Sequence, residues 1–348
     1  MPEPKGRNIT VVEAIREAVT QEMKNDESVF IIGEDIRIGG SFLFTLGLVD
    51  KFGPDRIIDM PISESGFVGM AIGAAIQGRR PIVDFQYGDF VLEAMDQIIQ
   101  QASKLHYMSG GQVNIPIVLQ MPTGASGRGS QHANSVEGFF FHIPGLKLVT
   151  PSTPYDAKGL MIRSIRDNNP VMFCVHKHNY GSKGRPLSNS TIATGHVPQE
   201  PYTIDFGKAD IKRTGKDVTI VSILRMVHLS INAAKELQKE GISAEVIDLR
   251  TLVPLDTETI IDSIKKTHRL VIVQEDNMRG GWGSEVSAIV AENALSYLDA
   301  PILRVASLDT PVPFSPLLED IVIPNETRII NTVRTQMDMN IKKDFNGQ

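Results

Sequence analysis

The chain has 348 residues and an ordinary globular composition, a length typical of two domains. Its formal net charge is -6 with acidic and basic residues dispersed along the sequence, so we expect neither nucleic acid nor a membrane as a partner. The polar start, Met1 to Thr10, precedes no apolar run that could be a signal sequence, and the single Cys174 cannot form an intrachain disulfide, so a cytoplasmic protein is expected.

Short apolar runs alternate with amphipathic segments in the first half, a pattern typical of a parallel sheet covered by helices. The predicted strands are 29–33, 81–85, 115–121, 146–150 and 171–175. The predicted helices, which have apolar residues at helical spacing, are 10–24, 65–77, 90–106 and 154–167. Capping signals mark two helix starts, with Glu13 three residues after Thr10, and Pro154 and Asp156 following Thr153.

From about residue 179 to 216 the pattern gives way to glycine, proline, serine and polar residues, as in a link between domains. The alternation then resumes at 217–223, 227–239, 244–249, 257–266, 270–274, 284–296 and 302–305. We therefore predict an α/β protein with two doubly wound domains, at residues 1–190 and 216–348, joined by a linker at 191–215.

A carboxylate lies where a loop turns into a helix rich in glycine and alanine, in the segment 59–69 (DMPISESGFVG). This places Glu64 at the N-terminus of the predicted helix. A glutamate there can serve only the helix dipole, which contributes roughly 0.3 to 1 kcal/mol. A role in chemistry is the alternative, and the residues alone leave both open.

Three aromatic residues, Phe85, Tyr87 and Phe90, come at the C-terminal end of the strand 81–85. Ligands of open α/β sheets usually bind at this edge, where the rings could stack on a flat heterocycle. Each of them could equally be a core residue.

A glycine-rich loop, 122–132, follows the strand 115–121 and ends at His132. A loop histidine titrates near neutral pH and suits proton transfer, although it could also be an ordinary surface residue. His142 has apolar neighbours and is predicted to be buried and hydrogen-bonded. His176 and His178 share one face of a strand, but no cysteine or carboxylate near them in sequence completes a metal site.

Two common phosphate-binding motifs are absent from the sequence: neither G-x-x-x-x-G-K-[ST] nor a G-x-G-x-x-G between a strand and a helix occurs. The segment 280–283 (GGWG) has a different spacing. A tight turn between a strand and a helix accounts for it.

Taken together, these segments resemble a known family over roughly residues 8–335: the β subunit of the thiamine-diphosphate-dependent component of 2-oxo acid dehydrogenase complexes, of the pyruvate, branched-chain 2-oxo acid or acetoin type. The matching blocks are GED (33–35), PISE (61–64), MDQI (95–98), YMSGG (107–111), QH (131–132), HIPGL (142–146), PSTPYDAKGL (151–160), DLRTL (248–252), PLD (254–256) and GGWGSE (280–285). The resemblance implies a pyrimidine-binding N-terminal domain, a transketolase-like C-terminal domain, and oxidative decarboxylation with acyl transfer to a lipoyl group, most simply from pyruvate.

The resemblance also implies roles for individual residues. Glu64 matches the glutamate that hydrogen-bonds N1′ of the cofactor's aminopyrimidine and so promotes loss of the thiazolium C2 proton. Phe90 matches an aromatic residue near the pyrimidine, with Tyr87 and Phe85 as its neighbours. His132 matches an active-site histidine that assists the bound intermediate and its transfer to the lipoyl group.

Further residues match ion and proton sites of the family. Glu34 and Asp96 match acidic residues that relay protons between paired active sites. Five residues match a structural potassium site built largely from backbone carbonyls: Ile117, Ser164, Ile165, Asp167 and Asn169.

The family's magnesium and diphosphate motif, G-D-G, belongs to an α subunit. This chain has only 88–90 (GDF) in its place. The resemblance therefore implies a heterotetramer, α2β2, with magnesium held mainly by the α subunit, and a lipoyl acyltransferase as a further partner.

Two departures from the family leave the substrate open. Val175 stands where many relatives have a glutamate, and Ile223 and Leu224 replace a more usual Tyr-Gly pair. The alternatives are an acetoin dehydrogenase β subunit, one half of a split transketolase, or a non-catalytic assembly subunit. Retention of both Glu64 and His132 argues against the last.

Overall fold

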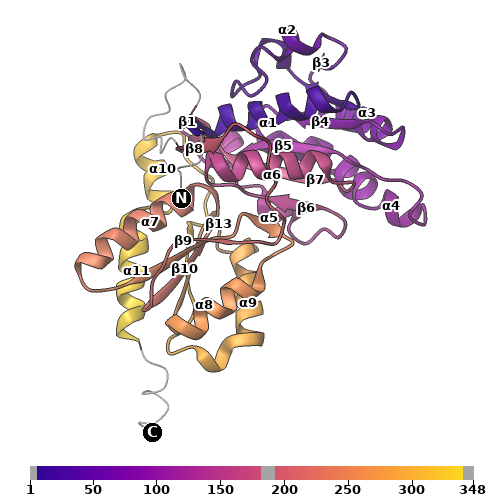
Figure 1. The fold of residues 1–348 in the computed structure, drawn as a ribbon. Helices are drawn as coiled ribbons and strands as arrows, with labels where there is room; N and C mark the ends of the chain where they lie inside the picture. Colours follow the sequence, from indigo (N-terminus) through magenta and orange to yellow (C-terminus); the bar gives the residue numbers. More distant parts are fainter. Residues whose placement is uncertain (1–5, 182–192, 340–348) are drawn as a thin grey trace.

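The structure is a computed structural model that describes residues 6–181 and 193–339, and its larger sheet is built mainly from the first half of the chain (Figure 1). The described strands of this sheet follow the order β12-β6-β7-β5-β4-β2-β3. All are parallel to their neighbours except β12, which is antiparallel to β6. Their bounds are β2 Val29–Gly33, β3 Ile57–Asp59, β4 Arg80–Asp84, β5 Val118–Thr123, β6 Lys147–Val149, β7 Val171–His176 and β12 Thr251–Val253.

Helices cover this sheet, and α1 packs along α6 (Figure 1). The α-helices of this half are α1 Val11–Asn25, α2 Leu48–Phe52, α3 Glu64–Ile76, α4 Leu105–Met108, α5 Glu137–Phe140 and α6 Pro154–Arg166. Short 3₁₀ turns are η1 Ile36–Ile38, η2 Gly88–Ala94, η4 Ser130–His132 and η5 Lys177–Asn179, and η3 Gln97–Ala102 is a π-helix. The predicted caps are confirmed, because Thr10 accepts from the amide of Glu13 and Thr153 from that of Asp156.

The second half of the chain builds a smaller sheet whose described strands follow the order β14-β13-β10-β11-β9. Only β9 is antiparallel to its neighbour. The elements are β9 Asp210–Arg213, β10 Val218–Ser222, α7 Leu224–Lys239, β11 Ala244–Asp248, α8 Thr257–Thr267, β13 Leu270–Asn277, α9 Trp282–Ala294, η6 Leu295–Tyr297, β14 Leu303–Ser307, α10 Pro316–Val322 and α11 Glu326–Asp338. The predicted α/β class, with two sheets wrapped by helices, is confirmed.

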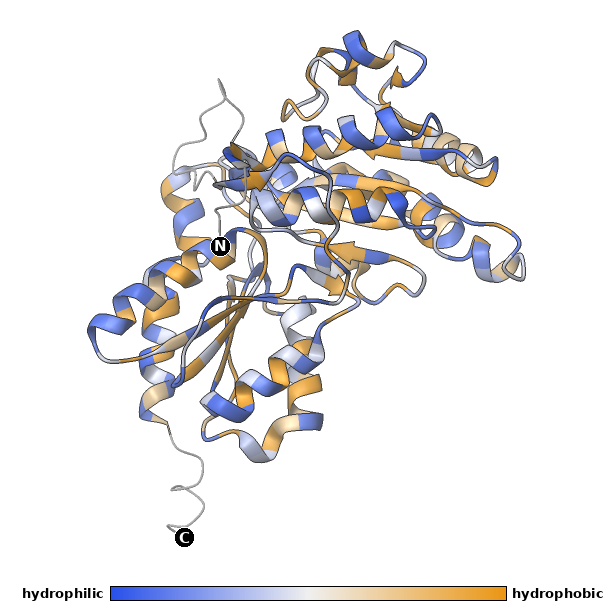
Figure 2. Ribbon diagram, viewed as in Figure 1, coloured by the Kyte–Doolittle hydropathy of each residue, from blue (hydrophilic) through white to orange (hydrophobic). Residues whose placement is uncertain are grey.

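The two halves share one packed core. A single cluster of buried side chains joins Leu148 and Met172 of the first sheet to Leu249, Leu252 and Trp282 of the second half. Figure 2 shows that the strands are mostly hydrophobic, while the helices carry hydrophilic residues on one side. Apolar burial therefore holds the two sheets against each other.

A buried ionic cluster reinforces this junction. Asp156, at the start of α6, pairs with Lys212 at 2.5 Å and with Arg250 at 2.9 Å. Both cations also pair with Asp210, and Lys212 lies 3.6 Å from Asp248. Because a buried charge that loses its partner is costly, this cluster disfavours separation of the halves.

The segment predicted as a helix at 90–106 is helical over most of its length, but it is not one continuous α-helix. The structure divides this segment into η2, η3 and α4. A Cβ on Gly88 would lie 2.9 Å from the carbonyl oxygen of Pro122, and the Asp89 carboxylate is buried. The close approach to Pro122 places the start of η2 against β5.

Several elements lie outside the sequence-based prediction. Strand β8 Thr194–Pro198 pairs with β1 Gly6–Thr10, and β8 and β9 fall inside the predicted linker 191–215, of which residues 191 and 192 lie outside the described residues. Helices α10 and α11 were not predicted. His142 is exposed rather than buried, because the turn after α5 points it away from the core.

Leu224, one of the two departures from the resembled family, begins α7 with φ of 53°. A left-handed backbone is unfavourable for leucine, which explains why glycine suits the position. Cys174 is buried as expected, and burial raises the pKa of its thiol.

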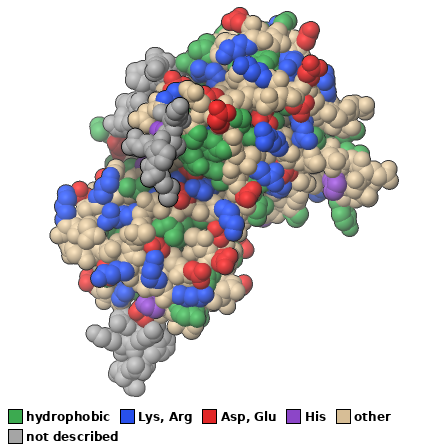
Figure 3. Space-filling model, viewed as in Figure 1, with side chains coloured by type: hydrophobic (Ala, Val, Ile, Leu, Met, Phe, Trp, Pro, Cys, Tyr) green, Lys and Arg blue, Asp and Glu red, His purple; other side chains and the backbone are tan. Residues whose placement is uncertain are grey.

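Positive and negative side chains are interspersed across the face of the molecule in Figure 3. Among the described helices, none is both long enough and apolar enough to cross a membrane. Over the same described residues, no three or more His, Cys, Asp or Glu side chains gather as a metal site would require.

Candidate active site

Two acidic side chains, Glu64 and Glu34, are buried near one another at the C-terminal edge of the larger sheet. Glu64 is the first residue of α3, and Glu34 directly follows β2; they are 7% and 8% exposed. Among the described residues, Oε1 of Glu34 has no hydrogen-bond partner. Burial raises the pKa of Glu34, and the charges of Glu64 and Asp35 raise it further. The edge therefore has acceptors available for a ligand.

A third carboxyl group, Asp84, ends β4 at the same edge. Gly33 of β2 pairs with Asp84 in the parallel ladder, so the strand ends that carry Glu34 and Asp84 are adjacent. Burial, followed by the charge of Glu34, raises the pKa of Asp84 to about 8. We did not predict Asp84 as a site residue, although an acidic residue that ends a buried parallel strand is a usable signal.

His132 lies between two aromatic rings that were predicted with it. Its imidazole centre is 4.8 Å from that of Tyr87 and 5.5 Å from that of Phe90, each at an interplanar angle of 81°. Tyr87 and Phe90 contact each other at 5.9 Å. All three rings are partly exposed, so one face of the group remains open. Residues 42 positions apart in sequence thus form one contact group.

Phe85 takes a different position from this group. It is 1% exposed and packs against Phe67 of α3 at 5.9 Å. Because α3 also packs against η2, Phe85 supports the turn that carries Phe90 rather than facing solvent beside it. This buried position does not support the prediction that Phe85 lies next to a pyrimidine ring.

Asp96 lies apart from the buried carboxylates. It is exposed at the start of η3, whereas Glu34 is buried at the sheet edge. Such π-helical turns recur at functional sites, and the relay stays a prediction.

The residues of the predicted potassium site gather at the C-terminal end of α6. Arg80 Nη1 donates to the backbone carbonyls of Ile165 at 2.9 Å and Asp167 at 3.0 Å. The Ile117 carbonyl accepts from the amide of Val171 at 2.9 Å, which joins the residue before β5 to the start of β7. The carbonyls of residues 165 and 167 therefore both accept from the Arg80 guanidinium, and the potassium site stays a prediction.

The Asp167 carboxylate itself is occupied. Lys147 and Arg163 approach its Oδ2 at 2.5 and 3.0 Å, and Asn169 donates its amide to Oδ1 at 2.9 Å. Burial alone would raise the pKa of Asp167, but the hydrogen bonds from Lys147 and Asn169 outweigh it and lower the pKa. The Ser164 hydroxyl donates to the Leu160 carbonyl, and the Ser164 carbonyl accepts from the amide of Asp167 at 3.2 Å.

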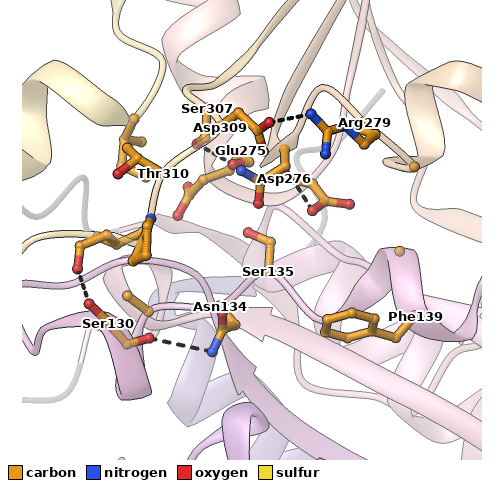
Figure 4. Close-up of a pocket in the computed structure, with 17 residues that line it drawn as sticks. Ser130, Asn134, Ser135, Phe139, Glu275, Asp276, Arg279, Ser307, Asp309 and Thr310 are labelled. Atoms are coloured by element: carbon orange, nitrogen blue, oxygen red, sulfur yellow. Dashed lines mark hydrogen bonds and ion pairs between the residues drawn. The ribbon is translucent and has the colours of Figure 1, made fainter.

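A cavity of about 580 Å³ lies behind the His132 loop, between the two halves of the chain (Figure 4). Ser130 and Asn134 line it from the loop, and Asp276 and an ion pair of Arg279 with Asp309 line it from the second half. Burial raises the pKa of Asp276 to about 6. Ser130, Ala133 and Asn134, on either side of His132 in the chain, line the cavity.

Several polar residues around this loop were missed by sequence reasoning. Asp89, Lys177 and Glu275 are buried and hydrogen-bond the loop, and His176 pairs with Glu275 at 2.8 Å. Glu275 comes from β13, about 100 positions from His176, so the sequence offers no local signal for the pair. No carboxylate lies near His176 in sequence, but the fold places that of Glu275 beside it.

Comparisons with known proteins cover nearly the whole chain. Residues 7–183 match the family "Transketolase, pyrimidine binding domain", and residues 207–329 match "Transketolase, C-terminal domain". The chain is 46% identical over 328 residues to the pyruvate dehydrogenase E1 component subunit beta of Rickettsia conorii, covering 94% of this chain and 97% of that one.

Two other similar proteins carry names other than pyruvate dehydrogenase. The acetoin:2,6-dichlorophenolindophenol oxidoreductase subunit beta of Cupriavidus necator is 46% identical over 343 residues, covering 95% of this chain and 98% of its own. A solved structure titled "Split gene transketolase, inactive beta4 tetramer" superposes with a TM-score of 0.75 at 21% identity, over 95% of this chain and 99% of that one. The latter likeness is one of fold.

Proposed function

The chain belongs to the family of thiamine-diphosphate-dependent β subunits that includes those of pyruvate and acetoin dehydrogenases, and we propose that it supplies the pyrimidine-binding half of a pyruvate dehydrogenase active site. The observation that supports this most is that pyruvate dehydrogenase β subunits of Rickettsia and Bacillus subtilis are 44 to 46% identical to this chain over nearly the full length of both chains. We further propose that the two matched regions are domains at residues 1–190 and 216–348, joined at 191–215.

The test of this proposal is the substrate preference of the assembled enzyme. We expect the chain, co-expressed with its α subunit, to reduce a lipoyl domain with a higher kcat/KM for pyruvate than for 3-methyl-2-oxobutanoate or acetoin. A preference for acetoin would indicate an acetoin dehydrogenase β subunit, because the Cupriavidus necator relative is also 46% identical to this chain. Ketol transfer to an aldose without lipoyl reduction would indicate a split transketolase. If the assembled enzyme turned over none of these substrates, the chain would be an assembly subunit.

The buried carboxylates fit the pyrimidine end of thiamine diphosphate. Glu64 stands in the first turn of α3, and Glu34 carries an oxygen without a partner among the described residues, so a ring nitrogen could share a proton there. The cofactor, when bound, supplies the nucleophilic carbon that attacks the 2-oxo group. Glu64 would hold the proton at N1′, while Tyr87 and Phe90 would exclude water from the ring.

The remaining partners are proposed on the family relationship. An α subunit would complete an α2β2 tetramer and hold magnesium and the diphosphate, and a lipoyl acyltransferase would accept the acyl group. We propose that the assembly acts in the cytoplasm. Glu34 and Asp96 would contribute to a proton relay between paired active sites.

His132 is assigned to the second half of the reaction, transfer to the lipoyl group. The imidazole is held edge-on by two rings and keeps one side open, a geometry that suits protonation of the sulfur that leaves when the lipoyl disulfide bond breaks. We expect His132→Ala to lower the lipoyl-dependent rate at least about tenfold, or roughly 1.4 kcal/mol, relative to decarboxylation with an artificial acceptor. The two rates are measured side by side. Equal rates to wild type in both assays would return His132 to an ordinary loop residue.

Potassium would share its carbonyl ligands with Arg80. Ile165 and Asp167 already turn two carbonyls toward one cation, so an ion there would bind the folded state and stabilise it. We expect a melting temperature at least about 2 °C higher in potassium chloride than in choline chloride, which for this size is about 1 kcal/mol. The variant Arg80→Gln should depend on potassium more strongly. Equal melting in both salts for both proteins would argue against the ion.

A further inference from the structure

Lys177 is a buried cation that reaches both ends of the His132 loop. It begins η5 directly after β7, and its side chain is 0% exposed. Its Nζ donates to the carbonyl of Gly124 at 2.9 Å and to the carbonyl of His132 at 2.8 Å. The third acceptor is Asp89 Oδ2 at 3.1 Å. An ammonium group has three protons, and each has an acceptor here.

Asp89, the carboxylate partner of Lys177, binds the chain just after His132. Its Oδ1 accepts from the backbone amide of Asn134 at 2.9 Å and from the Asn134 side chain at 2.6 Å. The Lys177 ammonium also lies 5.3 Å from the centre of the Tyr87 ring, on which the imidazole of His132 rests. The backbone on both sides of His132 and one of its flanking rings therefore contact a single ion pair.

The loop is held from the second half of the chain as well. Glu275 accepts from the amide of Ala125 at 2.7 Å, and Glu319 accepts from the amide of Gly127 at 2.8 Å. Gly124 has φ of 83°, and a Cβ there would lie 2.3 Å from the His176 ring, so the loop begins in close contact with its supports. These bonds fix the first part of the loop, and Lys177 is the group that ties that part to His132.

We infer that Lys177, paired with Asp89, is a positioning residue that sets His132 between Tyr87 and Phe90 for acyl transfer. The inference rests on the role proposed for His132. One ammonium that binds the carbonyls of residues 124 and 132 fixes the span of the loop, and hence where the imidazole stands. A misplacement of about 1 Å can cost on the order of a hundredfold in rate, so loss of this tie should be visible in kinetics.

The experiment compares Lys177→Met with a matched control, Lys158→Met, in the tetramer with the α subunit. Lys158 is also fully buried and also binds a carboxylate and backbone carbonyls, those of Glu17 and of residues 198–200, but it lies on α6 away from the loop. We expect Lys177→Met to lower the ratio of lipoyl-dependent to artificial-acceptor rate at least about tenfold. Lys158→Met should lose comparable thermal stability with that ratio unchanged.

Two further measurements separate positioning from general damage. Amide hydrogen exchange over residues 124–134 should increase in Lys177→Met and stay unchanged in Lys158→Met. The double variant Lys177→Met/His132→Ala should lose no more of the rate ratio than His132→Ala alone, because Lys177 acts through His132. Additive losses would overturn the inference.

A second variant covers the case in which Lys177→Met fails to fold with Asp89 left unpaired. Asp89→Asn combined with Lys177→Met removes both charges, and the same loss of rate ratio is expected. If His132→Ala lowers the rate ratio and the Asp89→Asn/Lys177→Met variant does not, the inference about Lys177 fails while the role proposed for His132 stands. If His132→Ala has no effect, the role proposed for His132 fails, and increased exchange confined to residues 124–134 would still support the tie made by Lys177.

Discussion

Exchange of the C2 proton of bound thiamine diphosphate is expected to slow by at least about a hundredfold in Glu64→Gln, which corresponds to roughly 2.7 kcal/mol. Glutamine keeps the shape of the side chain but cannot share a proton with N1′ as a carboxylate does. The fold should survive, since the described structure gives Glu64 no ion pair whose loss would strand a charge. Proton exchange followed by NMR on the tetramer measures the effect, and binding calorimetry shows whether the cofactor is still held.

The control addresses the possibility that Glu64 only serves the helix dipole. Glu258 is also an acidic residue in the first turn of a helix, α8, and it is exposed. Glu258→Gln should cost at most about 0.3 to 1 kcal/mol of stability and leave proton exchange at the wild-type rate. If Glu64→Gln behaves in the same way, Glu64 is a helix-terminal residue and no catalytic role remains for it.

Tight binding of the cofactor should require the α subunit, and this is the second large effect we expect. The diphosphate carries most of the ligand's charge and needs a cradle of amides or a metal, yet the chain has no G-D-G and neither common phosphate motif. We predict an affinity at least about a hundredfold weaker for the isolated chain than for the tetramer, a difference of about 2.7 kcal/mol. Calorimetry with magnesium present compares the two.

The comparison needs a check that the isolated chain is folded. Circular dichroism and a cooperative melting curve supply it, since the packed core across both sheets belongs to this chain alone. Tight, magnesium-dependent binding by the isolated, folded chain would contradict the prediction. It would also mean that residues of this chain bind the diphosphate by contacts that no motif indicates.

Secondary structure was most predictable where local signals agreed. The strand predicted at 29–33 is β2, Val29–Gly33, because an apolar run bounded by polar residues can only be buried on both sides. Helix α1 begins where the Thr10 and Glu13 pair indicated. Helix α11 had a similar signal, since Asn325 caps it, but its polar composition hid the buried stripe of Ile329 and Val333.

The site was predicted only in part. The aromatic group of Tyr87, Phe90 and His132 came together in the structure, whereas Phe85 packs in the core and Asp96 lies exposed. Phe85, Tyr87, Phe90 and His132 were named from their places at strand ends and Asp96 from a family motif, and a position in the chain does not specify what surrounds it. Their chemical roles stay predictions until the variants are measured.

The sequence by itself determined what depends on neighbours along the chain: the alternation of strands and helices, the caps, the burial of Cys174 and the family. Only the tertiary structure decided that β12 joins the larger sheet and that Lys177 meets Asp89, 88 positions away, beneath His132. A buried ion pair needs two partners and a space without water, and the packing of distant segments creates both. No local pattern of residues carries that information, because the free energy of such a contact arises only once the sheets are assembled.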